Sequence, residues 1–146
     1  MNDIKHHSDL LKQGEHQWPV RIYYEDTDMQ GIVYYANYLK YFERARTEFL
    51  RAQGFEQGAL IEEQGVAFAV RAVQVDYLKP AAFNDELIVT TNIAKLKRAS
   101  LIFHQTIVRQ SPIREIINTA VIKVACLDAN TMTVKAIPTA MIEKLS

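Results

Sequence analysis

One stretch of helical periodicity constrains the fold of this chain more than any other feature. In residues 36–53 the apolar side chains recur at about 100° per residue and share one face: Tyr38, Phe42, Ala45, Phe49 and Ala52. The opposite face is polar and carries Lys40, Arg44, Thr47 and Arg51. Gly54 then provides a natural helix stop. We expect one long amphipathic helix, which must bury its apolar face against the rest of the chain.

Most of the remaining chain has the composition of β-strands. The predicted strands cover residues 18–24, 66–78, 85–94, 100–109 and 114–127, with a last short strand at 131–136. A helical turn is expected at 59–64, and Pro138 opens a small helix that ends at Lys144. This order predicts an α+β fold in which an antiparallel sheet of about five strands curls around one long helix.

Composition limits the other possibilities. The 146 residues suffice for one domain, expected at 18–146 after a flexible, polar tail at 1–17. Lys plus Arg equals Asp plus Glu, 17 of each, so nothing indicates nucleic acid or an anionic membrane as a partner. Cys126 is the only cysteine, which excludes an intramolecular disulfide and the usual thiolate zinc site. No apolar run approaches the ~18 residues of a membrane span, so we expect a cytoplasmic protein.

The connection between the first strand and the helix carries the chemistry. Asp26 and Asp28 stand two residues apart, and Gly31 permits a close reversal of the chain. The backbone N–H groups of residues 34–37, at the helix start, have no partners within the helix. Such donors can stabilise an oxyanion while a carboxylate attacks a carbonyl or activates water. From spacing alone, a simple capping role for either acid is equally compatible with the pattern.

The motif resembles the signature of the hotdog-fold acyl-CoA thioesterases. The matching residues are Asp26-Thr27-Asp28-Met29-Gln30-Gly31-Ile32-Val33-Tyr34, Ala36-Asn37-Tyr38-Leu39, Phe42-Glu43-Arg44-Ala45-Arg46, Asp76-Tyr77-Leu78-Lys79-Pro80-Ala81 and Asp85-Glu86-Leu87. The likeness extends over about residues 21–138. It is strongest to the YbgC branch, which is associated with the Tol-Pal cell-envelope system, and next to the 4-hydroxybenzoyl-CoA thioesterases.

This resemblance implies thioester hydrolysis without a metal or other cofactor, coenzyme A being part of the substrate. It assigns the nucleophile or general base to Asp28 and the oxyanion donor to the backbone amide of Tyr35. Asp26 is expected to be structural, because acids in turns usually bind nearby backbone N–H groups. Gly31, Val33 and Tyr34 would contribute to substrate binding. Many YbgC-like members have a histidine where this chain has Tyr35. A backbone donor survives that change, and the Tyr35 hydroxyl could still position water or the acyl group.

Two further sets of charges are candidates for a function. Glu43 and Arg46, three residues apart on the helix, are expected to form a buried or interface ion pair, with Glu43 as a second acid at the pocket as the alternative. The 4-hydroxybenzoyl-CoA thioesterases hold nucleotide phosphates with a basic turn. The corresponding residues here are Lys97, Arg98 and Ser100, with Lys135 as an addition. An ordinary solvated turn is the alternative for this basic stretch.

The resemblance leaves the acyl group open, because short aliphatic and aromatic groups fit the same signature. It also leaves a second function, a module that binds acyl carrier protein or a scaffold in cell-envelope lipid metabolism. A hotdog dehydratase is disfavoured, since it would need a histidine near the motif. Because residues 66–78 are apolar at both alternating sets of positions, we expect a homodimer, and a dimer of dimers from the resemblance.

Overall fold

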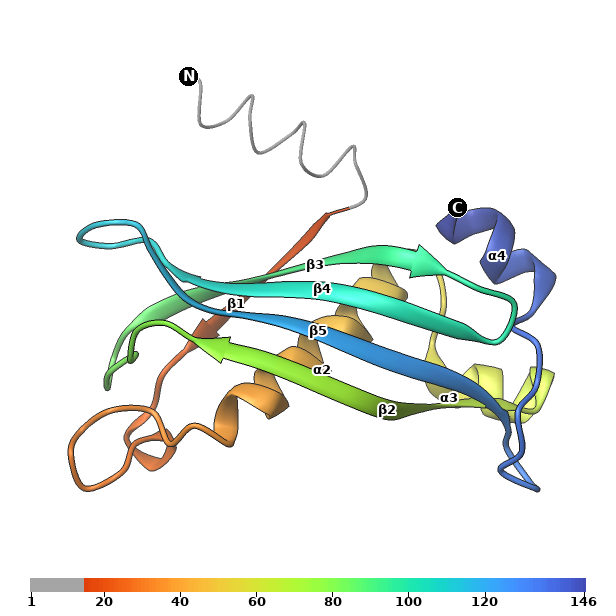
Figure 1. The fold of residues 1–146 in the computed structure, drawn as a ribbon, viewed down its shortest axis with the longest axis horizontal. Coiled ribbons are helices and arrows are strands. Elements are labelled where there is room, and N and C mark those ends of the chain that lie inside the picture. Colours follow the sequence, from red (N-terminus) through yellow and green to blue (C-terminus); the bar gives the residue numbers. More distant parts are fainter. Residues whose placement is uncertain (1–14) are drawn as a thin grey trace, which may run out of the picture.

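The computed structural model of the chain describes residues 15–146 (Figure 1). It consists of β1 (His16–Arg21), α2 (Asn37–Ala52), α3 (Gln57–Ala59), a π-helical turn (Leu60–Gln64), β2 (Val66–Tyr77), β3 (Glu86–Leu96), β4 (Ser100–Arg109), β5 (Glu115–Asp128) and α4 (Thr139–Leu145). Most of the predicted tail at 1–17 lies outside the described residues. β1 begins at His16, two residues before the predicted start of the domain.

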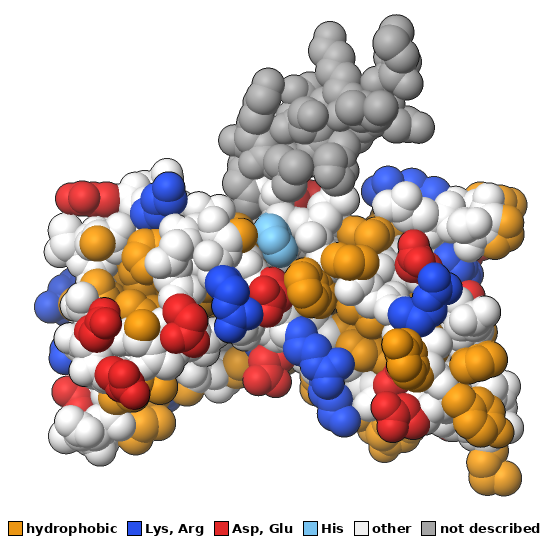
Figure 2. All heavy atoms as spheres, turned by 180° about the vertical axis from the view of Figure 1, so that it is seen from behind, with side chains coloured by type: hydrophobic (Ala, Val, Ile, Leu, Met, Phe, Trp, Pro, Cys, Tyr) orange, Lys and Arg blue, Asp and Glu red, His pale blue; other side chains and the backbone are white. Residues whose placement is uncertain are grey.

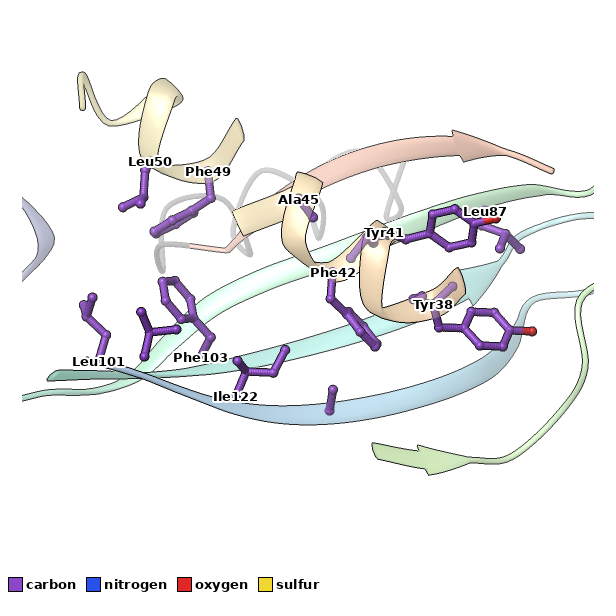
Figure 3. Packing of buried hydrophobic residues seen from close by; sticks show 14 of the residues in the cluster. Tyr38, Tyr41, Phe42, Ala45, Phe49, Leu50, Leu87, Leu101, Phe103 and Ile122 are labelled. Atoms are coloured by element: carbon purple, nitrogen blue, oxygen red, sulfur yellow. The ribbon is translucent and has the colours of Figure 1, made fainter. Parts of the chain in front are cut away.

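The five strands form one antiparallel sheet in the order β1-β3-β4-β5-β2. The long helix α2 packs against one face of this sheet, as predicted. Its buried side chains face apolar residues of the central strands, and Figure 3 labels Leu87 on β3, Leu101 and Phe103 on β4, and Ile122 on β5. The sheet and the helix together therefore bury one continuous core.

The buried face of α2 is wider than the predicted stripe. Tyr41 and Leu50 are buried in addition to the predicted Tyr38, Phe42, Ala45 and Phe49, whereas Ala52 at the end of the helix is exposed. Gly54 ends the helix with a φ of 96°, a left-handed conformation that a residue with a side chain adopts only with strain.

Two predicted strands differ from the structure for local reasons. The first strand ends at Arg21 and not at residue 24, because the Asp26 carboxylate accepts a hydrogen bond from Tyr23 N–H and closes a 3₁₀ turn over Tyr24–Asp26. The strand predicted at 131–136 is absent. Asp128 Oδ1 accepts from the N–H groups of Asn130 and Thr131 and bends the chain, and only an isolated bridge from Leu127 to Val134 remains.

β2 is an edge strand of 12 residues, and much of it is exposed in the single chain. Val70, Val73 and Tyr77 on this strand are among the exposed large hydrophobic side chains. An edge of this length and character is suited to pairing with another chain. None of the helices in residues 15–146 is long and apolar enough to cross a membrane.

Candidate active site

A tight loop over residues 26–36 leads from β1 to α2. Thr27 and Val33 form a bridge, and Asp28 N–H donates to Ile32 O at 2.9 Å. Gly31 N–H donates to Asp28 O at 3.0 Å and closes a turn at the tip. Gly31 has a φ of 79°, the left-handed conformation for which a glycine was expected here. Backbone hydrogen bonds therefore supply most of the contacts that fix this loop.

The loop is docked on residues 79–85, which precede β3. Val33 N–H donates to Ala81 O at 2.8 Å, and Ile32 and Ala82 form a second bridge. Tyr38, in the first turn of α2, accepts a hydrogen bond from Ala81 N–H at its hydroxyl oxygen, at 3.2 Å. The side chain of Val33 is buried in the core. The position of the loop thus depends on where the segment 79–85 lies.

A cluster of charged side chains around Arg109 fixes the segment 79–85. Arg109 Nη1, at the end of β4, donates to Asp85 Oδ2 at 2.9 Å and to Pro80 O at 3.1 Å. Arg109 Nη2 lies 3.1 Å from Glu115 Oε2, and Lys79 Nζ lies 3.2 Å from the same atom. The Lys79 ammonium, with Arg109 beside it, holds the pKa of the Glu115 carboxyl below its usual range.

The two acids of the loop have different surroundings. Asp26 is partly buried: its Oδ2 accepts from Tyr23 N–H at 2.7 Å, and its carbonyl accepts from Tyr34 N–H and from the Asn37 side chain. Asp28 is exposed, and its Oδ1 accepts from Gln30 N–H at 2.8 Å. Within residues 15–146 its second oxygen accepts no hydrogen bond. Asp26 therefore braces the loop, and Asp28 keeps an oxygen available to a reacting group.

The helix start offers fewer free donors than the sequence predicted. Tyr34 N–H donates to Asp26 O at 3.0 Å and Asn37 N–H donates to Tyr34 O at 2.9 Å, so both are already used. In the described part of the chain, the N–H groups of Tyr35 and Ala36 make no hydrogen bond. These two adjacent groups, at the positive end of α2, can bind a negatively charged oxygen.

Aromatic side chains surround this end of α2. The Tyr35 ring lies 5.0 Å from that of Tyr34 and 6.1 Å from that of Tyr77 on β2, between ring centroids. Tyr77 in turn lies 5.9 Å from Tyr38. The Tyr35 side chain is 60% exposed, and its hydroxyl makes no hydrogen bond to any described residue. Hydrophobic side chains gather at this end of the surface as well (Figure 2).

A groove of about 400 Å³ runs between α2 and the sheet, beginning one helical turn beyond Tyr35. Its walls are mostly apolar, and Leu39 and Val73 lie at the end nearest the loop. Glu43 and Arg46 also line it, but the predicted ion pair between them is not formed. Arg46 is buried and donates from Nη1 to Gln105 Oε1 at 3.0 Å, while Glu43 is exposed to solvent.

The turn between β3 and β4, which holds three of the predicted phosphate-binding residues, lies at the opposite end of the sheet from the loop before α2 (Figure 1). Lys97, Arg98 and Ser100 form the turn between β3 and β4, where Lys97 N–H donates to Ser100 O at 2.9 Å. Lys135 is nearby and lies 3.8 Å from Asp128. β4 runs from this turn to Arg109, a span of ~30 Å at ~3.3 Å per residue. One chain therefore does not bring the basic turn and Asp28 together.

Sequence reasoning missed the inward-facing polar residues. Gln105 and Thr91 occupy core positions of strands that are otherwise apolar there, and both are completely buried. A polar residue in the inward set of a strand is the signal that could have identified them. In residues 15–146, no group of three or more His, Cys, Asp or Glu side chains is arranged to hold a metal ion.

Comparison with known proteins agrees with this geometry. The family model of the thioesterase-like superfamily matches residues 23–145. An acyl-CoA thioesterase YbgC from Haemophilus influenzae is 45% identical over 121 residues, which cover 83% of this chain and 87% of that protein. The crystal structure of a probable thioesterase from Bartonella henselae is 31% identical, with a TM-score of 0.79 over 85% of this chain and 99% of that one.

The 4-hydroxybenzoyl-CoA thioesterase of a Pseudomonas species shares the fold, with a TM-score of 0.82 over 89% of this chain and 98% of that chain. At 21% identity, this likeness is evidence for the fold alone. The predicted hotdog architecture is thus confirmed by the observed sheet and helix and by these neighbours. The chain belongs to the thioesterase-like superfamily and, within it, to the YbgC branch of hotdog-fold proteins.

Proposed function

We propose that this protein hydrolyses acyl-CoA thioesters to a free acid and coenzyme A. The observation that supports this most directly is the pair of free N–H groups at Tyr35 and Ala36, which follow the exposed carboxylate of Asp28 in one rigid loop. The names of relatives such as the Haemophilus influenzae acyl-CoA thioesterase support the same reaction.

In the proposed mechanism, the thioester carbonyl oxygen accepts a hydrogen bond from Tyr35 N–H. Negative charge that develops on this oxygen is stabilised by the N–H group and by the helix dipole. Asp28 acts in one of two ways. As a base it takes a proton from a water that attacks the carbonyl carbon, and the coenzyme A thiolate leaves as the free acid forms. As a nucleophile it attacks the carbonyl carbon and expels the thiolate, and a water then hydrolyses the resulting acyl-aspartyl anhydride to the free acid and restores the carboxylate. Gly31 gives the substrate close access to the loop backbone, while Tyr34 and Tyr35 supply an aromatic wall.

The proposed active unit is a homodimer. Antiparallel pairing of two β2 edge strands about a two-fold axis would extend the sheet and pair the backbone groups of the exposed edge. It would also place the basic end of one chain beside the Asp28 end of the other. Lys97, Arg98, Ser100 and Lys135 of one subunit could then bind the phosphates of a coenzyme A whose thioester lies at the partner's loop. A dimer of dimers, a cytoplasmic location and a role beside the Tol-Pal system belong to this proposal.

A panel of acyl-CoA substrates, with release of free thiol as the readout, tests the reaction. We expect turnover by the wild-type protein and a loss of at least ~10²-fold in kcat for Asp28→Asn, because the amide can neither attack nor accept the proton. Glu25→Gln, which removes an exposed acid from the same loop region, is the matched control and should keep its activity. Wild-type turnover by Asp28→Asn would refute the assignment of Asp28.

The second candidate from the sequence, a module that binds acyl carrier protein, predicts a different result. Tight binding of an acylated carrier protein, without hydrolysis of any acyl-CoA or acylated carrier across chain lengths, would favour it. Short aliphatic and aromatic acyl groups are the first substrates to test, because they fit the signature of the family.

A further inference from the structure

The groove along α2 contains a buried cation that has no counter-ion among residues 15–146. Arg46 is 9% exposed, and within the described part of the chain its guanidinium makes a single hydrogen bond, to the neutral amide of Gln105. Among residues 15–146 no carboxylate forms a salt bridge with it. A buried charge that lacks an opposite charge is unfavourable, and the remaining N–H groups of a guanidinium are strong donors. The site is therefore suited to bind an anion.

The position of this cation is fixed by a hydrogen-bonded network. Gln105 Nε2 donates to Phe42 O at 3.0 Å and to Thr91 Oγ1 at 2.9 Å, so that Gln105 Oε1 is directed at Arg46. The network ties α2 to both β3 and β4. A guanidinium held in this way loses little conformational entropy when it binds a ligand, which is a condition for a specific site.

Arg46 remains charged in this environment. Burial lowers its pKa to about 10, an effect that the neighbouring Glu43 carboxylate opposes. Glu43 lines the same groove but is exposed to solvent, which screens its charge. Near neutral pH the groove thus presents a fixed positive charge on an otherwise largely apolar wall.

The distance from Tyr35 N–H to the Arg46 guanidinium sets the length of a ligand that could reach both. Arg46 follows Tyr35 by eleven residues, which is ~16 Å along a helix. Helical side chains lean back toward the N-terminus by about one turn, which leaves roughly 11 Å. An extended chain advances by about 1.2 Å per bond, so about nine bonds cover this distance. The cavity of about 400 Å³ falls in the range that holds ligands larger than a short acyl group.

We propose that Arg46 binds a carboxylate at the far end of the acyl group, so that the groove selects medium-length acyl-CoAs that end in a second carboxylate. This inference rests on the proposed thioesterase function and names a substrate class for the same site. The acyl chain would lie against Leu39, Val73 and Phe42, with its thioester at Tyr35 N–H and its terminal carboxylate on the Arg46 guanidinium. A two-point attachment of this kind fixes the length as well as the end group.

Matched pairs of substrates test this proposal. Decanedioyl-CoA, the mono-thioester of the ten-carbon diacid, is compared with decanoyl-CoA, and succinyl-CoA with butyryl-CoA. We expect kcat/KM to favour the ten-carbon diacid by about tenfold or more, as one charge-assisted hydrogen-bonded pair allows. The four-carbon pair is too short to reach Arg46 and should show no such preference. A ten-carbon acyl-CoA that ends in a hydroxyl group separates charge from simple polarity.

Three variants link the preference to the residue. Arg46→Met keeps the length of the side chain and should reduce the ratio for the ten-carbon pair to about one, and Arg46→Lys should retain part of it. Glu43→Gln removes the opposing charge and should raise the ratio. The control is Arg51→Met on the same helix, where the arginine is exposed and paired with Glu48, and the ratio should stay at the wild-type value.

Each outcome supports or overturns a stated claim. If no acyl-CoA is hydrolysed, the proposed function fails. If decanoyl-CoA is hydrolysed but the diacid is not preferred, or the hydroxyl-terminated chain is preferred over it, only the carboxylate site is wrong. Conversion of Arg46→Met to a monomer with an unchanged ratio would show that Arg46 pairs with a second copy of the chain. If Arg46→Met does not fold, the chain-length dependence and the opposite shifts of Arg46→Lys and Glu43→Gln decide the question.

Discussion

Polar groups at the start and in the middle of α2 are fixed by different kinds of hydrogen bond. At the start, the loop over residues 26–36 is fixed by backbone hydrogen bonds, and Asp28 projects into solvent. In the middle, Arg46, Gln105 and Thr91 are held by their own side chains inside the core. The difference separates two roles. The exposed Asp28 side chain is not needed for folding and is available for chemistry, whereas the buried side chains of the network are needed for folding.

The largest effect on stability is expected in the network. Gln105→Leu removes the acceptor for Arg46 and the donor for Phe42 O, and so leaves a buried charge without a partner. We expect a loss of about 3–5 kcal/mol in the free energy of unfolding, measured by urea denaturation. Gln110→Leu, at an exposed position beyond β4, should change stability by less than ~0.5 kcal/mol. Equal effects of the two variants would mean that the buried network contributes little.

Arg109 shares a property with each region. It is largely buried, like the network, but it supports the loop of Asp28. Arg109→Met leaves Asp85 and Glu115 without their shared cation and releases Pro80 O. We expect a loss of about 2 kcal/mol in stability and a fall in kcat with little change in KM, since residues 79–85 carry the loop of Asp28. Arg109→Lys should recover part of the kcat. Arg114→Met, at an exposed position, serves as the control.

The two acids of the loop provide a finer test. Asp26→Ala removes the cap on Tyr23 N–H and should cost about 1 kcal/mol of stability. Asp28→Asn should change stability by less than ~0.5 kcal/mol, although its effect on kcat is large. Thermal unfolding of both variants, followed by circular dichroism, gives the comparison. A greater loss of stability for Asp28→Asn would contradict the division of roles between these acids.

The smallest effect concerns acid pH. The pKa of Glu115 is lower in the folded protein than its ordinary value of 4.5, because of Lys79 and Arg109. The stability from this group is therefore present above that ordinary value and is lost as the pH falls through the lower, folded pKa. We expect the difference in unfolding midpoint between wild type and Glu115→Gln to shrink below about pH 4. Glu62→Gln, at an exposed position, should have nearly the same unfolding midpoint as wild type both at neutral pH and below about pH 4.

Much of the fold was accessible from the sequence because local patterns and tertiary structure agree. The apolar period of residues 36–53, with Gly54 after it, predicted α2 and its buried face, and the strand-like composition of residues 85–127 predicted β3, β4 and β5. The strand expected at 131–136 was wrong because the carboxylate of Asp128 captures two backbone N–H groups. A side chain that competes with the sheet for the backbone leaves little trace in an apolar pattern.

The candidate site was accessible only in part. Spacing placed Asp28, Gly31 and the helix start in one loop, but it could not tell which N–H groups are free. That distinction depends on Asp26 O, which takes the N–H group of Tyr34. The Glu43–Arg46 pair was expected from helical spacing, yet Arg46 turns inward to Gln105, a residue 59 positions away in the sequence. A contact between residues so far apart in the sequence depends on the order of the strands in the sheet. The spacing of residues along one helix gives no information about that order.

The separation of the basic turn from Asp28 along the sheet has a genetic consequence under the proposed dimer. A subunit with Asp28→Asn and a subunit with Lys97→Ala and Arg98→Ala would each form inactive dimers. A mixed dimer would nevertheless contain one intact site, built from the wild-type loop of one chain and the wild-type turn of the other. Two defective alleles expressed in the same cell should therefore complement each other, and a defective copy should not abolish the activity of a normal one.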